Sequence, residues 1–269
     1  IGVQISGSFR NTIGGTAPEA RNVIGGNVVG INLGTSSQNN VIQGNFIGLG
    51  ADGTTAVGNL IQGVVLRGNG GLGIQNNQIG GTVDGAGNTI ANNGAGGVVV
   101  FGDASSSRQN SGNAILGNSI FNNALSGPAQ FLGIDLAEET SGLGVTLNDL
   151  GDGDSGPNLL QNSPVLTSAT SDLFGTTIVG SLNSQSNTTY RIEFFSNATV
   201  SGTGFGEGET FVGFTEVTTN ASGNASFNTP LATTVPNGLF ITATAPSGGT
   251  TAGVAPTGAT PEFFRKQNL

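Results

Sequence analysis

The sequence predicts an all-β protein in which a right-handed parallel β-helix is followed by an Ig-like antiparallel β-sandwich. The first observation is a Gly-led apolar phrase that recurs at intervals of 28, 33, 34 and 36 residues. The second is a pair of Asn-x-Ile phrases inside each interval. The third is a change beyond residue 164, where longer segments of alternating polarity replace the recurrence.

The recurring phrases divide each unit into three short apolar segments. The Gly-led phrase reads Gly, apolar, any residue, apolar, and starts at Gly2, Gly30, Gly63, Gly97 and Gly133. The Asn-x-Ile phrases start at Asn11, Asn22, Asn40, Asn45, Asn77, Asn88, Asn113 and Asn118. Segments this short, rich in β-branched residues and bounded by Gly or Asn, are strand and turn signals. Three strands per unit over about four to five units are typical of a parallel β-helix whose coils stack about 4.8 Å apart.

The residue types of the repeat predict a structural role for each column. We expect the Ile residues of the Asn-x-Ile phrases to point inward and stack into one core. Asn tolerates left-handed backbone and bonds to nearby backbone, and stacked amides can bond to one another as a ladder. Gly accepts positive φ at tight corners. The recurring residues therefore predict construction and not catalysis.

The spacing between paired Asn-x-Ile phrases alternates between 11 and 5 residues. The longer spacing adds the segments "TAPEAR" and "TVDGAG" to alternate coils. Because matching corners of a solenoid lie above one another, these loops should form a row on one side. Insertions on one face of a solenoid are often its contact face.

The remainder of the chain is predicted as a sandwich with flanking segments. Its alternating segments cover 176–182, 189–196, 210–219, 224–231 and 239–245, and "NSPVLTSA" contributes the first strand. The predicted domains are a β-helix over 1–147, an acidic linker or cap over 148–164, the sandwich over 165–256 and a tail over 257–269. The tail "TPEFFRKQNL" is either a sandwich edge strand or a segment donated to a neighbouring molecule.

Composition limits the function. Cys and His are absent, so disulfides, thiol nucleophiles and histidine bases are excluded. The net charge of −9 argues against nucleic acid and anionic membranes as partners, and no apolar run is long enough for a transmembrane segment. Low charge with abundant Asn, Gly, Ser and Thr is typical of a secreted or cell-surface protein of bacteria or archaea.

Several phrases carry a family resemblance. "NTIGGT", "NVIQGNFIG", "GADGTTAVGN" and the segment from "LQNSPVLTSA" to "NASF" resemble bacterial secreted right-handed β-helix repeat proteins of pectate-lyase-like architecture, which often carry a C-terminal Ig-like module. The resemblance covers most of the chain. It implies extracellular display and no particular reaction.

The stretch "NDLGDGDSGPN" is the candidate metal site. Asp149, Asp152, Asp154 and Asn158 offer hard oxygen ligands at short spacing, which suits Ca²⁺, although the spacing is not that of an EF-hand. Asp135 lies just before this stretch and could add a carboxylate. The alternative is an acidic interdomain turn that caps the last coil. Ca²⁺ is the one cofactor that the sequence suggests.

No catalytic residue is assigned. A polysaccharide lyase would need Arg or Lys beside Ca²⁺, and residues 1–147 hold four arginines and no lysine. A hydrolase would need paired carboxylates, for which Glu19 and Asp84 in the two long loops are the nearest candidates. We therefore expect a non-enzymatic extracellular structural protein that displays loops or self-assembles into an oligomer or filament. The alternative is a carbohydrate-active or glycan-binding protein.

The first coil should be exposed, because a terminal coil presents apolar core and unpaired backbone. Earlier coils or another molecule would then cover it. Head-to-tail stacking of coils from successive copies would propagate as a fibre.

Overall fold

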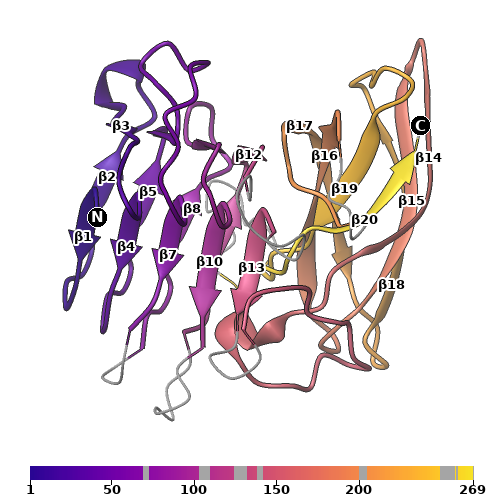
Figure 1. Cartoon of the computed structure of the whole chain (residues 1–269). Coiled ribbons are helices and arrows are strands. Elements are labelled where there is room, and N and C mark those ends of the chain that lie inside the picture. Colours follow the sequence, from indigo (N-terminus) through magenta and orange to yellow (C-terminus); the bar gives the residue numbers. More distant parts are fainter. Residues whose placement is uncertain are drawn as a thin grey trace.

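The computed structural model describes residues 1–68, 73–102, 110–123, 132–137, 142–199, 205–248, 258 and 260–268. These residues form three parallel sheets followed by two antiparallel sheets, so the predicted all-β class is confirmed (Figure 1). The helical elements of the described residues are two 3-10 turns, η1 (Pro18–Ala20) and η2 (Pro157–Leu160).

The chain visits the three parallel sheets in turn, with one short strand in each. The first sheet contains β1 (Val3–Ile5), β4 (Ile31–Leu33), β7 (Val64–Leu66), β10 (Val98–Phe101) and β13 (Ile134–Ala137). The second contains β2 (Thr12–Gly14), β5 (Val41–Gln43), β8 (Gln78–Gly80) and β11 (Ala114–Leu116). The third contains β3 (Val23–Ile24), β6 (Phe46–Ile47), β9 (Thr89–Ala91) and β12 (Ser119–Phe121). We call one circuit a coil and residues 1–137 the coil stack. This topology is compatible with the predicted parallel β-helix.

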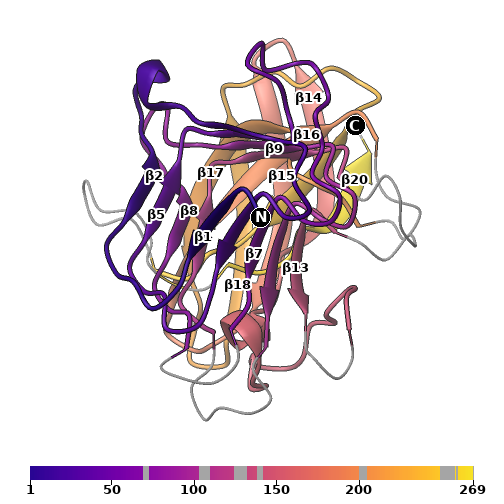
Figure 2. The same ribbon diagram turned by 60° about the vertical axis from the view of Figure 1, so that its left-hand side comes forward.

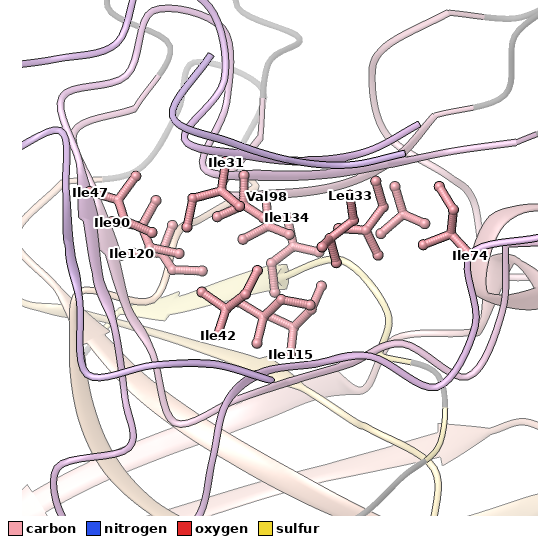
Figure 3. Close-up of a cluster of buried hydrophobic side chains, with 14 of the residues drawn as sticks. Ile31, Leu33, Ile42, Ile47, Ile74, Ile90, Val98, Ile115, Ile120 and Ile134 are labelled. Atoms are coloured by element: carbon pink, nitrogen blue, oxygen red, sulfur yellow. The ribbon is translucent and has the colours of Figure 1, made fainter. Parts of the chain in front are cut away.

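The predicted isoleucine columns form the core of the coil stack. Ile13, Ile42, Ile79 and Ile115 pair in register across the second sheet, and Ile24, Ile47, Ile90 and Ile120 pair across the third. All eight are buried and belong to one apolar cluster. Figure 3 shows five of them, Ile42, Ile47, Ile90, Ile115 and Ile120, together with Ile31, Leu33, Val98 and Ile134 of the first sheet. Three short strands per coil thus bury one continuous apolar interior.

Gly starts each coil because the coils approach too closely for a side chain. A Cβ on Gly30 would lie 2.4 Å from the Gly63 carbonyl oxygen, and a Cβ on Gly97 would lie 2.5 Å from that of Gly133. Such contacts are far inside van der Waals distance. The recurring Gly of the sequence is therefore required by the stacking distance.

Three rows of asparagines run along the coil stack, one more than the Asn-x-Ile phrases predict. In each row the backbone N–H and the Nδ2 group of one Asn both donate to Oδ1 of the Asn in the next coil. The rows are Asn11–Asn40–Asn77–Asn113, Asn22–Asn45–Asn88–Asn118 and Asn27–Asn59–Asn93–Asn123. The predicted amide ladder is confirmed.

The left-handed corners belong to the residue before the row asparagine. Asn39, Asn76, Asn92 and Asn122 have φ between 52° and 60°, and each directly precedes a row asparagine. Gly occupies the same place before Asn45 and Asn118. The two roles expected of Asn, corner and ladder, therefore fall on neighbouring residues.

The second half of the chain forms two antiparallel sheets. One contains β14 (Val165–Asp172), β15 (Gly175–Asn183) and β18 (Asn224–Leu231). The other has the order β17 (Thr210–Thr218), β16 (Thr189–Asn197), β19 (Phe240–Thr244) and β20 (Phe264–Asn268). One apolar cluster draws residues from both sheets, so the sheets pack face to face. We call residues 165–268 the antiparallel region.

The sheet that contains β16 lies between the coil stack and the other antiparallel sheet (Figures 1 and 2). Tyr190, Ile192 and Phe194 face the antiparallel core, whereas Phe195 belongs to the apolar cluster of the coil stack. The alternation read from the sequence is thus confirmed, and both faces of β16 are buried. The antiparallel region is therefore docked on the C-terminal end of the coil stack.

Candidate functional site

The C-terminal end of the coil stack is covered by polar groups of later segments. The first Asn row ends at Asn158, whose Oδ1 accepts the backbone N–H of Asn113 at 3.0 Å. The third row ends at Glu207, which accepts from the backbone N–H and Nδ2 of Asn123 at 3.2 and 2.9 Å. Each of these groups occupies the place that the Asn of a next coil would hold.

Two more glutamates complete this cover. Glu193 accepts the backbone N–H of Gly117 at 2.9 Å and pairs with Arg191 at 2.8 Å. Glu262 accepts the backbone N–H of Leu136 at 3.0 Å. We call Glu193, Glu207 and Glu262 the acidic cap. Carboxylates suit this end because the Asn rows leave N–H donors there.

Burial raises the pKa of every carboxyl in the acidic cap. The pKa of Glu207 rises to about 7 and that of Glu262 to about 8, because both side chains are withdrawn from water. Burial also raises the pKa of Glu193, against the opposing effect of the Arg191 charge. Asp135, on β13, has its pKa raised by burial to about 7 and lies close enough to affect Glu262.

The C-terminal tail seals the same end and does not project from the molecule. Phe263 is buried edge-on against Phe195, with ring centroids 5.3 Å apart, in the apolar cluster of the coil stack. Thr260 Oγ1 accepts the backbone N–H of Ile115 at 2.8 Å. β20 then pairs with β19 as the edge strand of its sheet. Of the two predicted roles for the tail, the edge strand is confirmed.

The N-terminal end is different. Strands β1, β2 and β3 are each the last strand of their sheet, so each has one unpaired edge. Exposed apolar side chains gather in this coil, and they are Ile1, Phe9, Val23 and Val28. A depression of about 820 Å³ lies there, lined by residues of the first coil such as Val3, Ile13 and Ile24. The first coil thus combines an unpaired strand edge in each sheet with exposed apolar side chains.

A groove of about 630 Å³ lies on the outer face of the first sheet. Gln4, Asn32 and Val65 face outward in register along this sheet, and Arg67 and Phe101 line the groove beside them. The Arg67 guanidinium lies 4.7 Å from the centre of the Phe101 ring. Asn32 Oδ1 is buried, and no donor of the described residues bonds to it. The groove thus offers a guanidinium and an aromatic ring, whereas the unsatisfied Asn32 oxygen is buried in its wall.

The predicted aspartate cluster forms. Oxygens of Asp149, Asp152 and Asp154 lie within 4.8 Å of one another, with Asp152 buried and the other two nearer the surface. Asp152 accepts from the Asn162 backbone N–H at 2.9 Å and from Ser184 Oγ at 2.5 Å. Asp149 Oδ1 is buried without a hydrogen-bond donor among the described residues. Three converging carboxylates, one with an unsatisfied oxygen, suit a hard cation such as Ca²⁺.

The other two residues considered for this site lie elsewhere. Asn158 accepts twice from Asn113 and donates to Asn113 and Thr260, so its side chain is fully used at the coil end. Asp135 accepts from the Gly144 backbone N–H at 3.2 Å and lies near Glu262. Both side chains thus have other partners, and their part in a Ca²⁺ site stays a prediction.

The long loops meet as predicted. Gly44, at the short corner of the second coil, lies against the carbonyls of Gly15 and Gly85 from the first and third coils. Glu19 and Asp84 are exposed on these loops. They remain candidates for surface contacts.

The acidic cap and the third Asn row could not be recognised from the repeat alone. In the third row only Asn59 starts an Asn-x-Ile phrase, because the residues two positions after Asn27, Asn59 and Asn93 are Val, Ile and Ala. Its sequence signal is the recurrence of Asn three to four residues before the Gly of the next coil. Glu207 and Glu262 had no signal, because their partners lie 84 and 126 residues away.

No protein-family model matches the chain, and no curated protein sequence is significantly similar to it. In the part of the chain that the structure describes, no helix has the length and apolar character needed to cross a membrane.

Proposed function

We propose that the chain is a non-enzymatic extracellular structural protein, displayed on a cell surface or built into a larger extracellular assembly. In this proposal the coil stack is a right-handed parallel β-helix, and the antiparallel region is an Ig-like sandwich that closes one end. The function is mechanical: the stack is a stiff, protease-resistant rod.

One observation carries the proposal. The recurring polar residues are used to hold the coils together, since each row Asn of the second and third coils bonds to the coils before and after it. The buried glutamates continue the same task, because each accepts a backbone N–H of the last coils. Polar groups that a catalyst would direct at a substrate are here directed at the backbone.

The route of assembly expected from the sequence needs revision. A fibre of coils stacked head to tail requires two open ends. The antiparallel region occupies the C-terminal end, so coil-on-coil stacking of copies has no second surface. Self-association would instead use the long loops or the sides of the molecule.

Two measurements test this proposal. Native material is labelled on intact cells with a membrane-impermeant reagent, and surface labelling is expected. The purified chain is then incubated with a panel of acidic and neutral polysaccharides, with and without Ca²⁺. Release of oligosaccharides would overturn the structural function, and resistance of the coil stack to proteases would support it.

A second candidate function is glycan binding at the groove of the first sheet. Arg67 and Phe101 line this groove and provide hydrogen bonds and an aromatic face, and Gln4, Asn32 and Gln62 line it with side-chain amides. Hydroxyl-rich ligands supply the complementary groups. These groups favour ligand binding at this groove over a purely structural role for the first sheet.

Arginine substitutions separate this candidate from non-specific binding. Arg67→Gln should abolish binding on a glycan array if the groove is the site. Arg21→Gln is the matched control, because Arg21 lies 4.0 Å from the Phe46 ring on another face. Equal loss in both variants, or no binding by the parent chain, would exclude the groove.

A further inference from the structure

The turn between β14 and β15 exposes two large apolar side chains. Leu173 is 94% exposed and Phe174 is 90% exposed, the two highest values among the large apolar residues that the structure describes. Turns of this kind favour Gly, Asn, Asp and Ser, so the local fold does not require Leu and Phe at these positions. We call residues 172–175 the apolar turn.

The apolar turn is held in a fixed shape. Strands β14 and β15 pair as far as Asp172 and Gly175. Asp172 Oδ1 accepts the backbone N–H of Phe174 at 2.8 Å, and Thr234 Oγ1 donates to the Asp172 carbonyl oxygen at 3.3 Å. A turn that is ordered before binding loses little conformational entropy when a partner covers its two apolar side chains.

The groove on the outer face of the first sheet has complementary chemistry. Its volume of about 630 Å³ lies within the range of about 300–1,000 Å³ that binding pockets occupy. Val29, Phe101 and Leu143 pack against the buried Val65 and give the groove an apolar lining. Arg67 is exposed, and it is the one charged residue among the described residues that line the groove.

The charges of the groove and the apolar turn are opposite. Asp172 is exposed, and it is the one charged residue between positions 165 and 190. It directly precedes the two exposed apolar residues, just as Arg67 lies beside Phe101 in the groove, 4.7 Å from the centre of its ring. Each surface thus combines apolar side chains with a single charge, negative on the turn and positive in the groove.

The apolar turn cannot reach the groove of its own molecule. The groove lies on the coil stack, whereas β14 and β15 belong to the antiparallel sheet that is farther from the coil stack (Figures 1 and 2). The turn that joins them projects at the upper right of Figure 1. A contact between the two surfaces therefore joins two molecules. Because the surfaces differ, each molecule can contact one copy through its turn and another through its groove, so the assembly can propagate.

We propose that the apolar turn of one copy docks in the groove of the first sheet of a second copy. Leu173 and Phe174 cover the apolar lining of the groove, and Asp172 pairs with Arg67. Burial of the apolar side chains drives the association, and the charge pair fixes its orientation. This proposal rests on the structural function proposed above and deepens it, because it names a second copy as the partner and the two surfaces that meet.

Sedimentation of the full chain at rising concentration is the first test. The mass should increase with concentration and should pass that of a dimer. Leu173→Ser combined with Phe174→Ser should weaken the association about tenfold or more. Leu150→Ser is the matched control, because Leu150 is 89% exposed in another loop, and it should leave the association unchanged. A parent chain that stays monomeric up to about 1 mM would overturn the proposal.

A charge exchange tests whether these two surfaces meet. Asp172→Lys and Arg67→Glu each place like charges in the contact, so each variant alone should associate about fivefold or more weakly than the parent chain. An equimolar mixture of the two variants should regain association, because the turn of each then meets a groove of opposite charge. A local structural effect of either substitution cannot produce this rescue. A mixture that associates as weakly as the separate variants would refute the contact.

Other occupants of the two surfaces give different results. A monomeric chain that binds a glycan and loses this binding in Arg67→Gln would assign the groove to sugars and overturn the proposal. A monomeric chain that binds phosphatidylcholine vesicles through Leu173 and Phe174 would assign the turn to lipid, with the same consequence. Failure of the structural function is recognised separately, because it requires oligosaccharide release, which neither sedimentation nor the charge exchange measures.

Discussion

The two ends of the coil stack are made by the same repeat and are completed in different ways. At the C-terminal end, Asn158, Thr260 and the acidic cap accept N–H groups of the last coils, and Phe263 closes the apolar interior. At the N-terminal end, Asn11, Asn22 and Asn27 are the first donors of their rows, and four apolar side chains of the first coil are exposed. Because the Asn rows all run in one direction, the ends are chemically opposite, one rich in donors and the other in acceptors. A closing group for one end therefore cannot serve the other.

The largest difference in stability between the two ends should appear when a phenylalanine of each end is replaced by alanine. Phe263→Ala removes a buried ring from the closed end and should lower the free energy of unfolding by about 3–5 kcal/mol. Phe9→Ala at the open end should change it by less than about 0.5 kcal/mol, because Phe9 is 49% exposed. Urea unfolding measures both. Similar losses at the two positions would show that the open end is better packed than its exposure indicates.

The second-largest effect on the free energy of unfolding should come from the position of an Asn within its row. Asn88→Ala removes the acceptor for the backbone N–H and Nδ2 of Asn45, all of them buried. The expected loss is about 2–4 kcal/mol, since buried donors are left unsatisfied. Asn22→Ala in the same row removes an exposed side chain and should cost about 1 kcal/mol or less. Equal losses of stability in the two variants would show that the buried hydrogen bonds of the Asn row add nothing, and that the isoleucine core alone stabilises the coils.

The contribution of the closed end to the free energy of unfolding should depend on pH, whereas that of the open end should not. The pKa of Glu207 is raised to about 7 and that of Glu262 to about 8, so the folded state binds more protons than the unfolded one above pH 4.5. The stability that this proton binding contributes is present below pH 4.5 and is lost as the pH rises through 7 to 8. A decrease on the order of 3 kcal/mol per group is expected over this range.

Glutamine variants identify the source of this dependence. Glu207→Gln combined with Glu262→Gln keeps an acceptor oxygen at each place and removes the titration. The unfolding temperature of this variant should vary less between pH 5 and pH 9 than that of the parent. A parent chain whose stability is flat over this range would contradict buried carboxyls at the closed end.

The smallest effect is expected from Ca²⁺ at the aspartate cluster beside the closed end. At a concentration about tenfold above its dissociation constant, the ion should stabilise the chain by about 1 kcal/mol. Asp149→Asn should abolish this shift, whereas Asp52→Asn should not, because Asp52 is satisfied by Thr54 and Thr55 in a separate loop. A shift that persists in Asp149→Asn would place the ion elsewhere.

Much of the coil stack could be predicted because its interactions repeat. The isoleucine columns, the amide ladder and the row of long loops each leave a phrase that recurs in the sequence. The third Asn row was missed because its Asn is followed by residues that vary. Asn158 was assigned to a Ca²⁺ site because its neighbours in sequence are acidic, although its side chain completes an Asn row.

Stacked short parallel strands with Ile inside, Asn at the corners and Gly between close coils could be inferred from the residues alone, because those choices are made again in every coil. How the stack ends could be seen only in the folded chain. The glutamates that close it, Glu193, Glu207 and Glu262, bond to the last coils across 76 to 126 residues and occur once each. A contact made once has no period, so it becomes visible only when the chain is folded.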